Sequence, residues 1–134
     1  MMRAILCVIL LLAAASAWAD WVKLTETTDT VYYLDPALIS DKGEFRRGVV
    51  IQSYATQEPA GTRSRRVSYE IDCGGERLRS VAVTEYSEPM AQGKSVNSWE
   101  RQSEWPYVAP ITGSNIPRRT PYRLILKFVC SKSE

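Results

Sequence analysis

The chain has 134 residues, of which 45% are hydrophobic and 24% are charged, with 17 Lys and Arg against 15 Asp and Glu. This composition excludes a disordered chain and a two-domain enzyme, and a net charge of only +2 argues against a nucleic-acid-binding protein. Histidine is absent, so catalysis by Ser-His or Cys-His pairs and metal or haem sites built on imidazole are excluded.

The N-terminus has the features of a secretory signal peptide. Arg3 supplies an early positive charge, an apolar run follows from Ala4 to Ala15, and Ala17-Trp18-Ala19 has the small-x-small pattern that precedes cleavage. We therefore expect a signal peptide over residues 1–19 and one exported domain over residues 20–134. The location expected for this domain is the periplasm or the medium.

No lasting membrane attachment is expected. The apolar run is shorter than the roughly 20 residues that a membrane-spanning helix needs. Cys7 lies inside this run, with too short an apolar stretch before it to be a lipid-attachment cysteine. Cleavage of the signal peptide would remove Cys7 and leave two cysteines.

Those two cysteines, Cys73 and Cys130, predict a disulfide. An exported protein meets an oxidising compartment, and two cysteines allow only one intramolecular pairing. The alternative is a reactive thiol pair, which usually has C-x-x-C spacing or a cysteine beside a basic group at a helix start. Neither pattern is present, which favours a structural bond.

The first two thirds of the exported chain predict antiparallel strands. Short stretches rich in β-branched and aromatic residues are separated by turn residues, and Val67 to Cys73 alternates strictly between apolar and polar side chains. The turn signals Asp41-Lys42-Gly43 and Cys73-Gly74-Gly75, with a longer loop at Glu58–Gly61, predict that sequential strands pair as a meander. The predicted strands are Trp21–Leu24, Thr30–Leu34, Phe45–Tyr54, Val67–Cys73 and Leu78–Tyr86, with Ser95–Trp99 as a candidate sixth.

The last segment predicts a helix. Tyr122, Ile125, Phe128 and Val129 have helical spacing, Thr120 is a suitable N-cap, and Pro121 suits the first helical position. A strand is the alternative, because Tyr122, Leu124, Leu126 and Phe128 also alternate. The expected fold is α+β: a small antiparallel meander of five to six strands, a C-terminal α-helix packed on one face, and one disulfide.

Several short segments follow one another in a characteristic order along the chain. They are Trp21-Val22, Val31–Asp35, Ile71-Asp72-Cys73, Glu85–Gly93, Trp105, Pro110, Gly113-Ser114 and Val129-Cys130. In this order they resemble the surface-adhesin protein E-like domain of Gram-negative bacteria. This resemblance implies a small antiparallel sheet with a helix on one side and the disulfide linking them. It also implies binding, because the namesake of the family is an outer-membrane adhesin for host matrix and serum proteins.

Two properties of the namesake are not expected here. It is a lipoprotein, whereas this sequence has no usable lipid-attachment cysteine, so surface display is not supported. Haem has been proposed as a ligand in the family, but without histidine an axial ligand would have to be Tyr, Met or Lys. We therefore expect no cofactor.

Arg63, Arg65 and Arg66 form one of three local concentrations of arginine, with Arg46-Arg47 and Arg118-Arg119. The guanidinium group suits sulfate, carboxylate or phosphate groups of an acidic partner. On a strand, Arg63 and Arg65 would share one face while Arg66 points to the other. The alternative is a solvated strand edge whose charge discourages pairing with other edges.

The run from Tyr86 to Gly93 is the second candidate. Tyr86 and Met90 could belong to a binding loop; the alternative is a structural turn in which Gly93 has a positive φ and Tyr86 anchors in the core. The carboxylates of Glu70 and Asp72 share a strand face that we expect to be solvated, so they do not predict an acid-base pair.

Together these features predict a non-enzymatic, adhesion-like binding module of the bacterial envelope. The alternative is a periplasmic structural or accessory protein that binds another envelope component. The expected partner is a protein or an acidic glycan, not nucleic acid. Monomer and homodimer both stay open, because sheet edges of small domains often pair.

Overall fold

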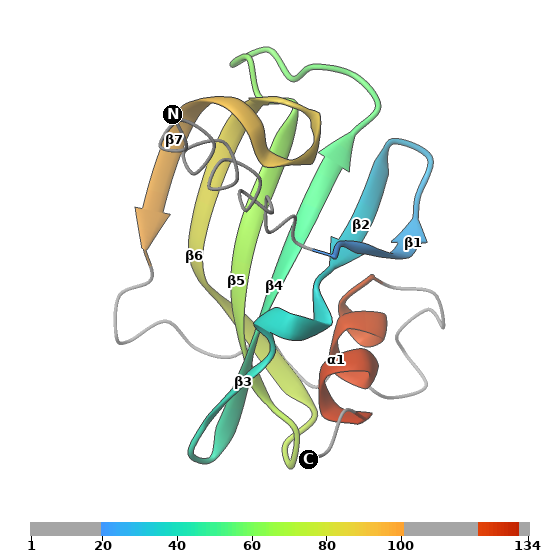
Figure 1. The fold of residues 1–134 in the computed structure, drawn as a ribbon, viewed down its shortest axis with the longest axis vertical. Coiled ribbons are helices and arrows are strands. Elements are labelled where there is room, and N and C mark those ends of the chain that lie inside the picture. Colours follow the sequence, from blue (N-terminus) through green and yellow to red (C-terminus); the bar gives the residue numbers. More distant parts are fainter. Residues whose placement is uncertain (1–19, 101–120, 132–134) are drawn as a thin grey trace, which may run out of the picture.

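The computed structural model describes residues 20–100 and 121–131. Within these ranges the chain forms one antiparallel sheet, one α-helix and two short 3-10 helices (Figure 1). The strands are β1 (Val22–Glu26), β2 (Thr30–Leu34), β3 (Ser40–Lys42), β4 (Phe45–Tyr54), β5 (Ser64–Asp72), β6 (Arg77–Glu88) and β7 (Gln92–Glu100). The helices are η1 (Pro36–Leu38), η2 (Pro89–Ala91) and α1 (Pro121–Ser131).

The sheet is a meander, as predicted. Its strand order is β1-β2-β4-β5-β6-β7, each neighbour pairs antiparallel, and β3 forms a hairpin with β4 off this path. The observed sheet has seven strands, whereas five to six were expected. The additional strand is β3, three exposed residues with the sequence Ser-Asp-Lys, whose polar composition is typical of a turn.

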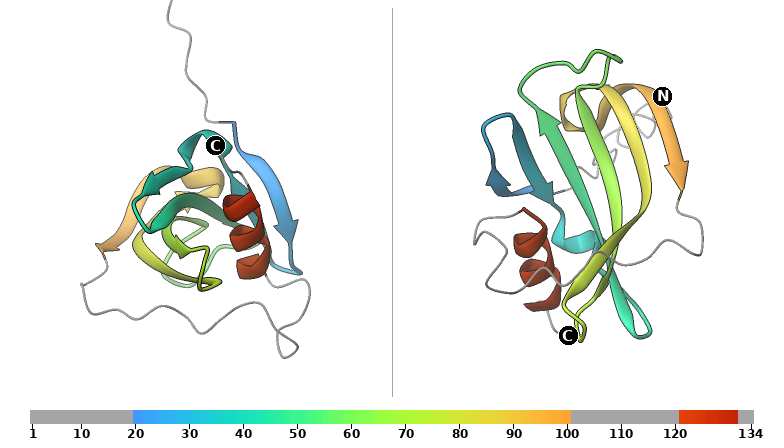
Figure 2. Two further views of the ribbon diagram at one scale, coloured as in Figure 1. Left: turned by 90° about the horizontal axis from the view of Figure 1, so that it is seen from below. Right: turned by 180° about the vertical axis from the view of Figure 1, so that it is seen from behind.

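Helix α1 covers one face of the sheet and excludes the strand alternative for this segment. Its buried residues are Ile125, Leu126 and Val129, which share one side of a helix and pack into the core with Leu34, Val50 and other strand residues. Figure 2 shows the sheet curving around this side, with α1 next to β1 and the lower ends of the central strands. The predicted α+β fold is therefore confirmed.

The predicted disulfide is also confirmed. Cys73 follows β5 and Cys130 lies in the last turn of α1, with their Cα atoms 5.7 Å apart. This separation is ordinary for a disulfide. The bond ties the C-terminal end of the helix to the turn between β5 and β6.

The expectation that Glu70 is solvated is wrong. Glu70 is only 2% exposed. Its Oε1 accepts hydrogen bonds from Arg79 Nε at 3.0 Å and from Arg79 Nη2 at 2.5 Å. Glu70 and Arg79 are directly opposed on β5 and β6. Alternation assigns a side chain to a face of the sheet, but it does not show how deeply that face is covered.

Asp72, on the same face, remains partly accessible. Its carboxylate accepts hydrogen bonds from the backbone N–H of Gly75 at 3.0 Å and from Arg77 Nε at 2.9 Å. These bonds lower the pKa of Asp72 because they stabilise its ionised form, and the bond from Gly75 has the largest effect.

Several sequence expectations lie outside the described residues: the signal peptide at 1–19, the N-cap Thr120, the Arg118-Arg119 pair and the segment containing Trp105. Among the residues that are described, no helix has the length and apolar character needed to cross a membrane.

Candidate binding site at the η2 end of the sheet

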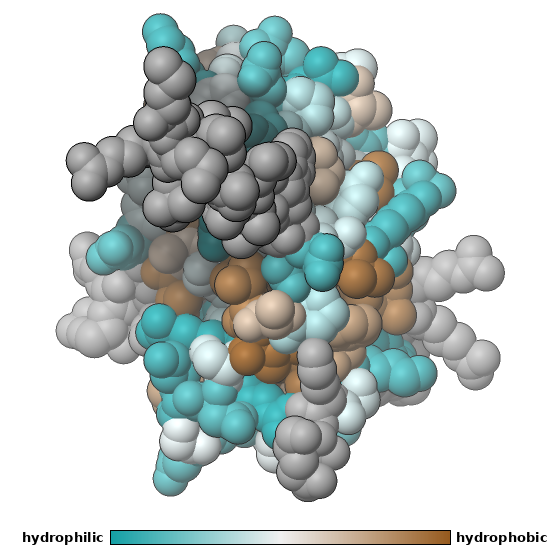
Figure 3. Space-filling model, in the orientation of Figure 1, coloured by the Kyte–Doolittle hydropathy of each residue, from teal (hydrophilic) through white to brown (hydrophobic). Residues whose placement is uncertain are grey.

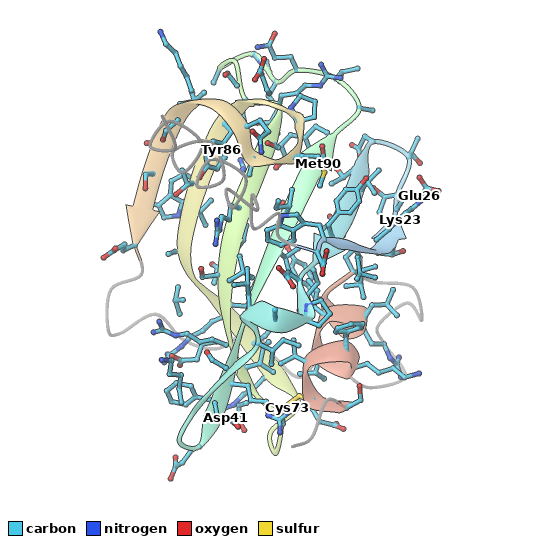
Figure 4. The ribbon with its side chains drawn as sticks, viewed as in Figure 1. Lys23, Glu26, Asp41, Cys73, Tyr86 and Met90 are labelled. Atoms are coloured by element: carbon cyan, nitrogen blue, oxygen red, sulfur yellow. A yellow bond between two sulfur atoms is a disulfide. The ribbon has the colours of Figure 1, made fainter. Side chains whose placement is uncertain are left out.

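All five predicted partner-binding residues lie at one end of the sheet. We call it the η2 end: the end of β4, the loop to β5, the start of β5, and the end of β6 with η2. Figure 4 places Tyr86 and Met90 here and Cys73 at the opposite end of the molecule. The predicted residues at the η2 end are Arg63, Arg65, Arg66, Tyr86 and Met90.

The turn around η2 has an unusual backbone. Met90 and Ala91 have φ values of 59° and 55°, and Gly93 has a φ of 78°. The positive φ expected at Gly93 is thus observed, whereas those at Met90 and Ala91 were not anticipated. The left-handed conformation costs a residue with a side chain roughly 1 to 2 kcal/mol, so surrounding contacts must hold this turn.

Two serine hydroxyls hold the turn against the sheet. Ser64 Oγ donates to the carbonyl of Glu88 at 2.6 Å and accepts from the backbone N–H of Ala91 at 2.9 Å. Ser64 is fully buried. On β4, Ser53 Oγ accepts from the N–H of Met90 at 3.4 Å. The backbone of η2 is therefore bonded to both β4 and β5.

Arg63 fastens the loop between β4 and β5. Its Nε donates to the carbonyl of Tyr54 and its Nη2 to the carbonyl of Ala55, both at 3.0 Å. The backbone N–H of Arg63 also donates to the carbonyl of Tyr86 at 2.8 Å. The guanidinium group thus satisfies backbone acceptors of this loop.

Arg65 lies in a cluster with two carboxylates and a phenol ring, which we call the Arg65 cluster. Its Nη2 is 3.6 Å from Glu85 Oε1 and 3.9 Å from Glu58 Oε2, and its guanidinium carbon is 5.9 Å from the ring centre of Tyr54. The Thr62 hydroxyl donates to the Glu85 carboxylate, and both residues are buried. Arg65 Nε is itself buried without a hydrogen-bond partner.

Burial keeps Tyr54 protonated. Burial raises the pKa of Tyr54 to about 12; Arg65 opposes the increase, and Glu58 and Glu85 add to it. The Tyr54 hydroxyl is therefore a neutral donor at physiological pH, and it lies 3.4 Å from Gln52 Oε1.

Arg66 points away from the Arg65 cluster, as alternation predicts. Its guanidinium carbon is 6.0 Å from the ring centre of Trp21, and the residue is exposed. The three arginines therefore do not form one continuous surface. Tyr86 is only half-buried and lies outside the core cluster, which differs from the expected core anchor.

Sequence reasoning missed the groups that position the predicted residues. These are the hydroxyl and carboxylate side chains of Ser53, Thr62, Ser64 and Glu85. Register brings them together: Ser53 is opposite Ser64 on β4 and β5, and Arg65 is opposite Glu85 on β5 and β6. No spacing within a single strand reveals such pairs.

In Figure 3 the upper part of the molecule is mainly hydrophilic where grey atoms do not cover it, whereas apolar surface gathers around η1 and toward α1. In the described part of the chain, no group of three or more His, Cys, Asp or Glu residues could hold a metal ion. The η2 end thus offers arginine, hydroxyl and aromatic groups on a constrained backbone, which suits recognition of a polar partner.

Comparison with known proteins identifies a family that matches this chain and a solved structure with a similar fold. The family model described as surface-adhesin protein E matches residues 21–131. The crystal form II structure of Haemophilus influenzae protein E is similar, with a TM-score of 0.57 and 16% identity over 85% of this chain and 89% of that chain. At this identity the likeness concerns the fold. No curated protein sequence matches this chain.

Proposed function

Because the chain belongs to the surface-adhesin protein E family, we propose that it is an exported, non-enzymatic binding protein of the bacterial envelope that uses its η2 end. The partner proposed is a protein or an acidic glycan. The observation that carries this proposal is that Arg63, Arg65, Arg66, Tyr86 and Met90 all lie at the same end of the sheet, although the arginines face different sides of it.

The constrained backbone of the η2 end supports this role. Met90 and Ala91 adopt the left-handed conformation at a cost in stability, and Ser53 and Ser64 hold them there. Such strain is concentrated at binding sites, where a fixed loop lowers the ordering entropy that association costs.

The accessible groups would make the contacts. Met90 is partly exposed on the turn, and Arg66 is exposed with its guanidinium next to Trp21. An adaptable thioether and an arginine beside an aromatic ring suit a protein surface or the sulfate and carboxylate groups of a glycan. Arg63 and Arg65 would support the site without contacting the partner, because their guanidinium groups contact the loop and the neighbouring carboxylates.

The test is binding of the exported protein to immobilised matrix proteins, sulfated glycans and envelope extracts. We expect retention by at least one of these, with an affinity reduced roughly thirtyfold by Arg66→Gln combined with Met90→Ser, since each of the two lost contacts is worth roughly 1 kcal/mol. The matched control is Arg47→Gln combined with Lys42→Ser, which changes two exposed residues of the β3–β4 hairpin, outside the η2 end.

Retention that both double variants reduce equally would place the contact elsewhere on the molecule. No retention of the folded protein at micromolar concentration on any of these surfaces would contradict the binding function itself. Circular dichroism and thermal unfolding of each variant separate loss of contact from loss of fold.

A further inference from the structure

A pocket of about 450 Å³ lies beside the disulfide, at the end of the molecule opposite η2. Both cysteines line it, and both are only half-buried. Most of the rest of its lining comes from α1, with Leu126 as an apolar wall and Arg123 and Lys127 as charged groups. The two residues of the disulfide thus border a space large enough for a small molecule.

The charge of this pocket favours an anion. Arg123 and Lys127 are four residues apart, so they are neighbours on one side of α1. Neither belongs to an ion pair within the described ranges, and Glu76 is the one acidic residue among the lining residues that the structure describes. Two cations beside one carboxylate give the pocket a net positive charge.

We propose that this pocket binds small anionic thiols and presents the Cys73–Cys130 disulfide to them for thiol–disulfide exchange. Exchange requires a thiolate to reach a disulfide sulfur, and neighbouring cations both attract an anionic thiol and stabilise the thiolate that leaves. The place of both partly buried cysteines in the pocket lining supports the first requirement, and Arg123 with Lys127 supports the second.

The helix end indicates which sulfur is attacked. Cys130 lies in the last turn of α1, where the negative end of the helix dipole disfavours a thiolate, so Cys73 is the better leaving group. The incoming thiolate therefore bonds to Cys130 Sγ, the Sγ–Sγ bond breaks, and its electron pair leaves on Cys73 Sγ as a thiolate. A second thiolate attacks the sulfur of the bound thiol in this mixed disulfide and releases Cys130. Two thiols are oxidised to a disulfide, and the protein disulfide gains two electrons.

The experiment compares reduction of the folded protein by three thiols of different charge: mercaptoethanesulfonate, mercaptoethanol and cysteamine. Rates are measured at low ionic strength and expressed per concentration of thiolate, with the reduced protein and the mixed disulfide followed by alkylation and mass spectrometry. We expect the anionic thiol to react roughly fivefold faster than the neutral one, and the cationic thiol to react slowest. The two nearby cations attract the anionic thiol and repel the cationic one, and solvent and salt partly screen both interactions.

Arg123→Gln combined with Lys127→Gln should abolish this order of rates, while Lys23→Gln combined with Lys42→Gln, at exposed sites outside the pocket, should preserve it. Equal rates for the three thiols in the unaltered protein would overturn the proposal. So would a charge preference that survives in the pocket variant, or a reduction rate independent of thiol concentration, which would mean that the bond reacts only after unfolding. Binding at the η2 end is measured separately, so neither result depends on the other.

Discussion

Arg46 on β4 donates from Nη1 to the carbonyl oxygen of Val129 in α1, at 2.9 Å. The carbonyls of the last helical turn have no partner within the helix, and this bond satisfies one of them. The Nε atom of Arg46 lies 3.0 Å from Asp41 Oδ1, which keeps the side chain in position. The end of α1 is thus held by a hydrogen bond to the sheet as well as by the disulfide.

Replacement of both Cys73 and Cys130 by serine should lower the free energy of unfolding by about 4 kcal/mol. The bond closes a sequence separation of 57 residues, and its removal restores chain entropy to the unfolded state. Urea unfolding of the oxidised protein and the variant measures the difference. A loss below about 1 kcal/mol would mean that the native packing of α1 needs no covalent tether.

Gly48→Ala should destabilise the protein by roughly 1 to 3 kcal/mol through overpacking. A Cβ at this position would be 3.0 Å from Val129 Cγ2 and 3.7 Å from Ile71 Cδ1, so the Val129 side chain, or α1 with it, would have to shift. Gly74→Ala is the control, because its Cβ would meet only Asp72 Oδ1 at 3.7 Å. Thermal unfolding that is equal for the two variants would contradict the close approach of helix and sheet.

Glu70→Gln should cost about 2 to 3 kcal/mol, because it removes the carboxylate that Arg79 contacts in a buried position. The matched variant Glu26→Gln breaks the exposed pair with Lys23 and should change stability by less than about 1 kcal/mol. Chemical unfolding curves compare the two. Equal losses would place Glu70 in solvent, as alternation alone suggests.

The stability of the protein should fall in alkaline solution as Tyr54 ionises in the unfolded chain. Its pKa is about 12 in the folded protein, against 10.0 for an unperturbed tyrosine, so the unfolded chain loses the proton first. The contribution is therefore complete below pH 10 and is lost between about pH 10 and 12. Tyr54→Phe should make this decline shallower, as measured by unfolding at a series of pH values. An unchanged slope would show that the ring is not buried.

Gly93→Ala should destabilise the η2 end by roughly 2 kcal/mol. The φ of 78° is unfavourable for alanine, and the new Cβ would lie 2.6 Å from Ser87 Oγ. Gly61→Ala has a similar φ penalty, with φ of 94°, but its Cβ would meet only Gln57 Nε2 at 3.9 Å, so its loss should be about half as large. Hydrogen exchange of the Ala91 and Lys94 amides reports the change locally, and protection that is unchanged in Gly93→Ala would contradict it.

Much of this fold could be predicted because its signals are local. The alternation of Val67, Tyr69 and Ile71 predicted a strand, the spacing of Ile125 and Val129 predicted the helix, and the turn residues between strands predicted a meander. The hairpin strand β3 was missed, since three polar residues carry no apolar pattern and gain their conformation from pairing with β4.

The candidate site was predictable in its residues and not in its arrangement. The basic run placed Arg65 and Arg66 on opposite faces, which the structure shows. The carboxylate next to Arg65 belongs to Glu85, which is 20 positions away in the sequence. The hydroxyl that holds η2 belongs to Ser64, which donates a hydrogen bond to the carbonyl of Glu88 at the end of β6. These contacts depend on register, including the bulge between Ser68 and Tyr69, and a bulge leaves no mark in the pattern of a single strand.

By itself, the order of residues determined the meander and favoured the terminal helix over a strand, because periodicity and turn chemistry act over short stretches. It also predicted the pairing of Cys73 with Cys130, because these are the two cysteines of the expected exported domain. Only the tertiary structure decided that Glu70 is buried against Arg79, that Met90 and Ala91 have positive φ, and that the disulfide borders a basic pocket. Burial and backbone strain depend on which distant segments come into contact, and that is decided when strands pair in register and the helix packs against them.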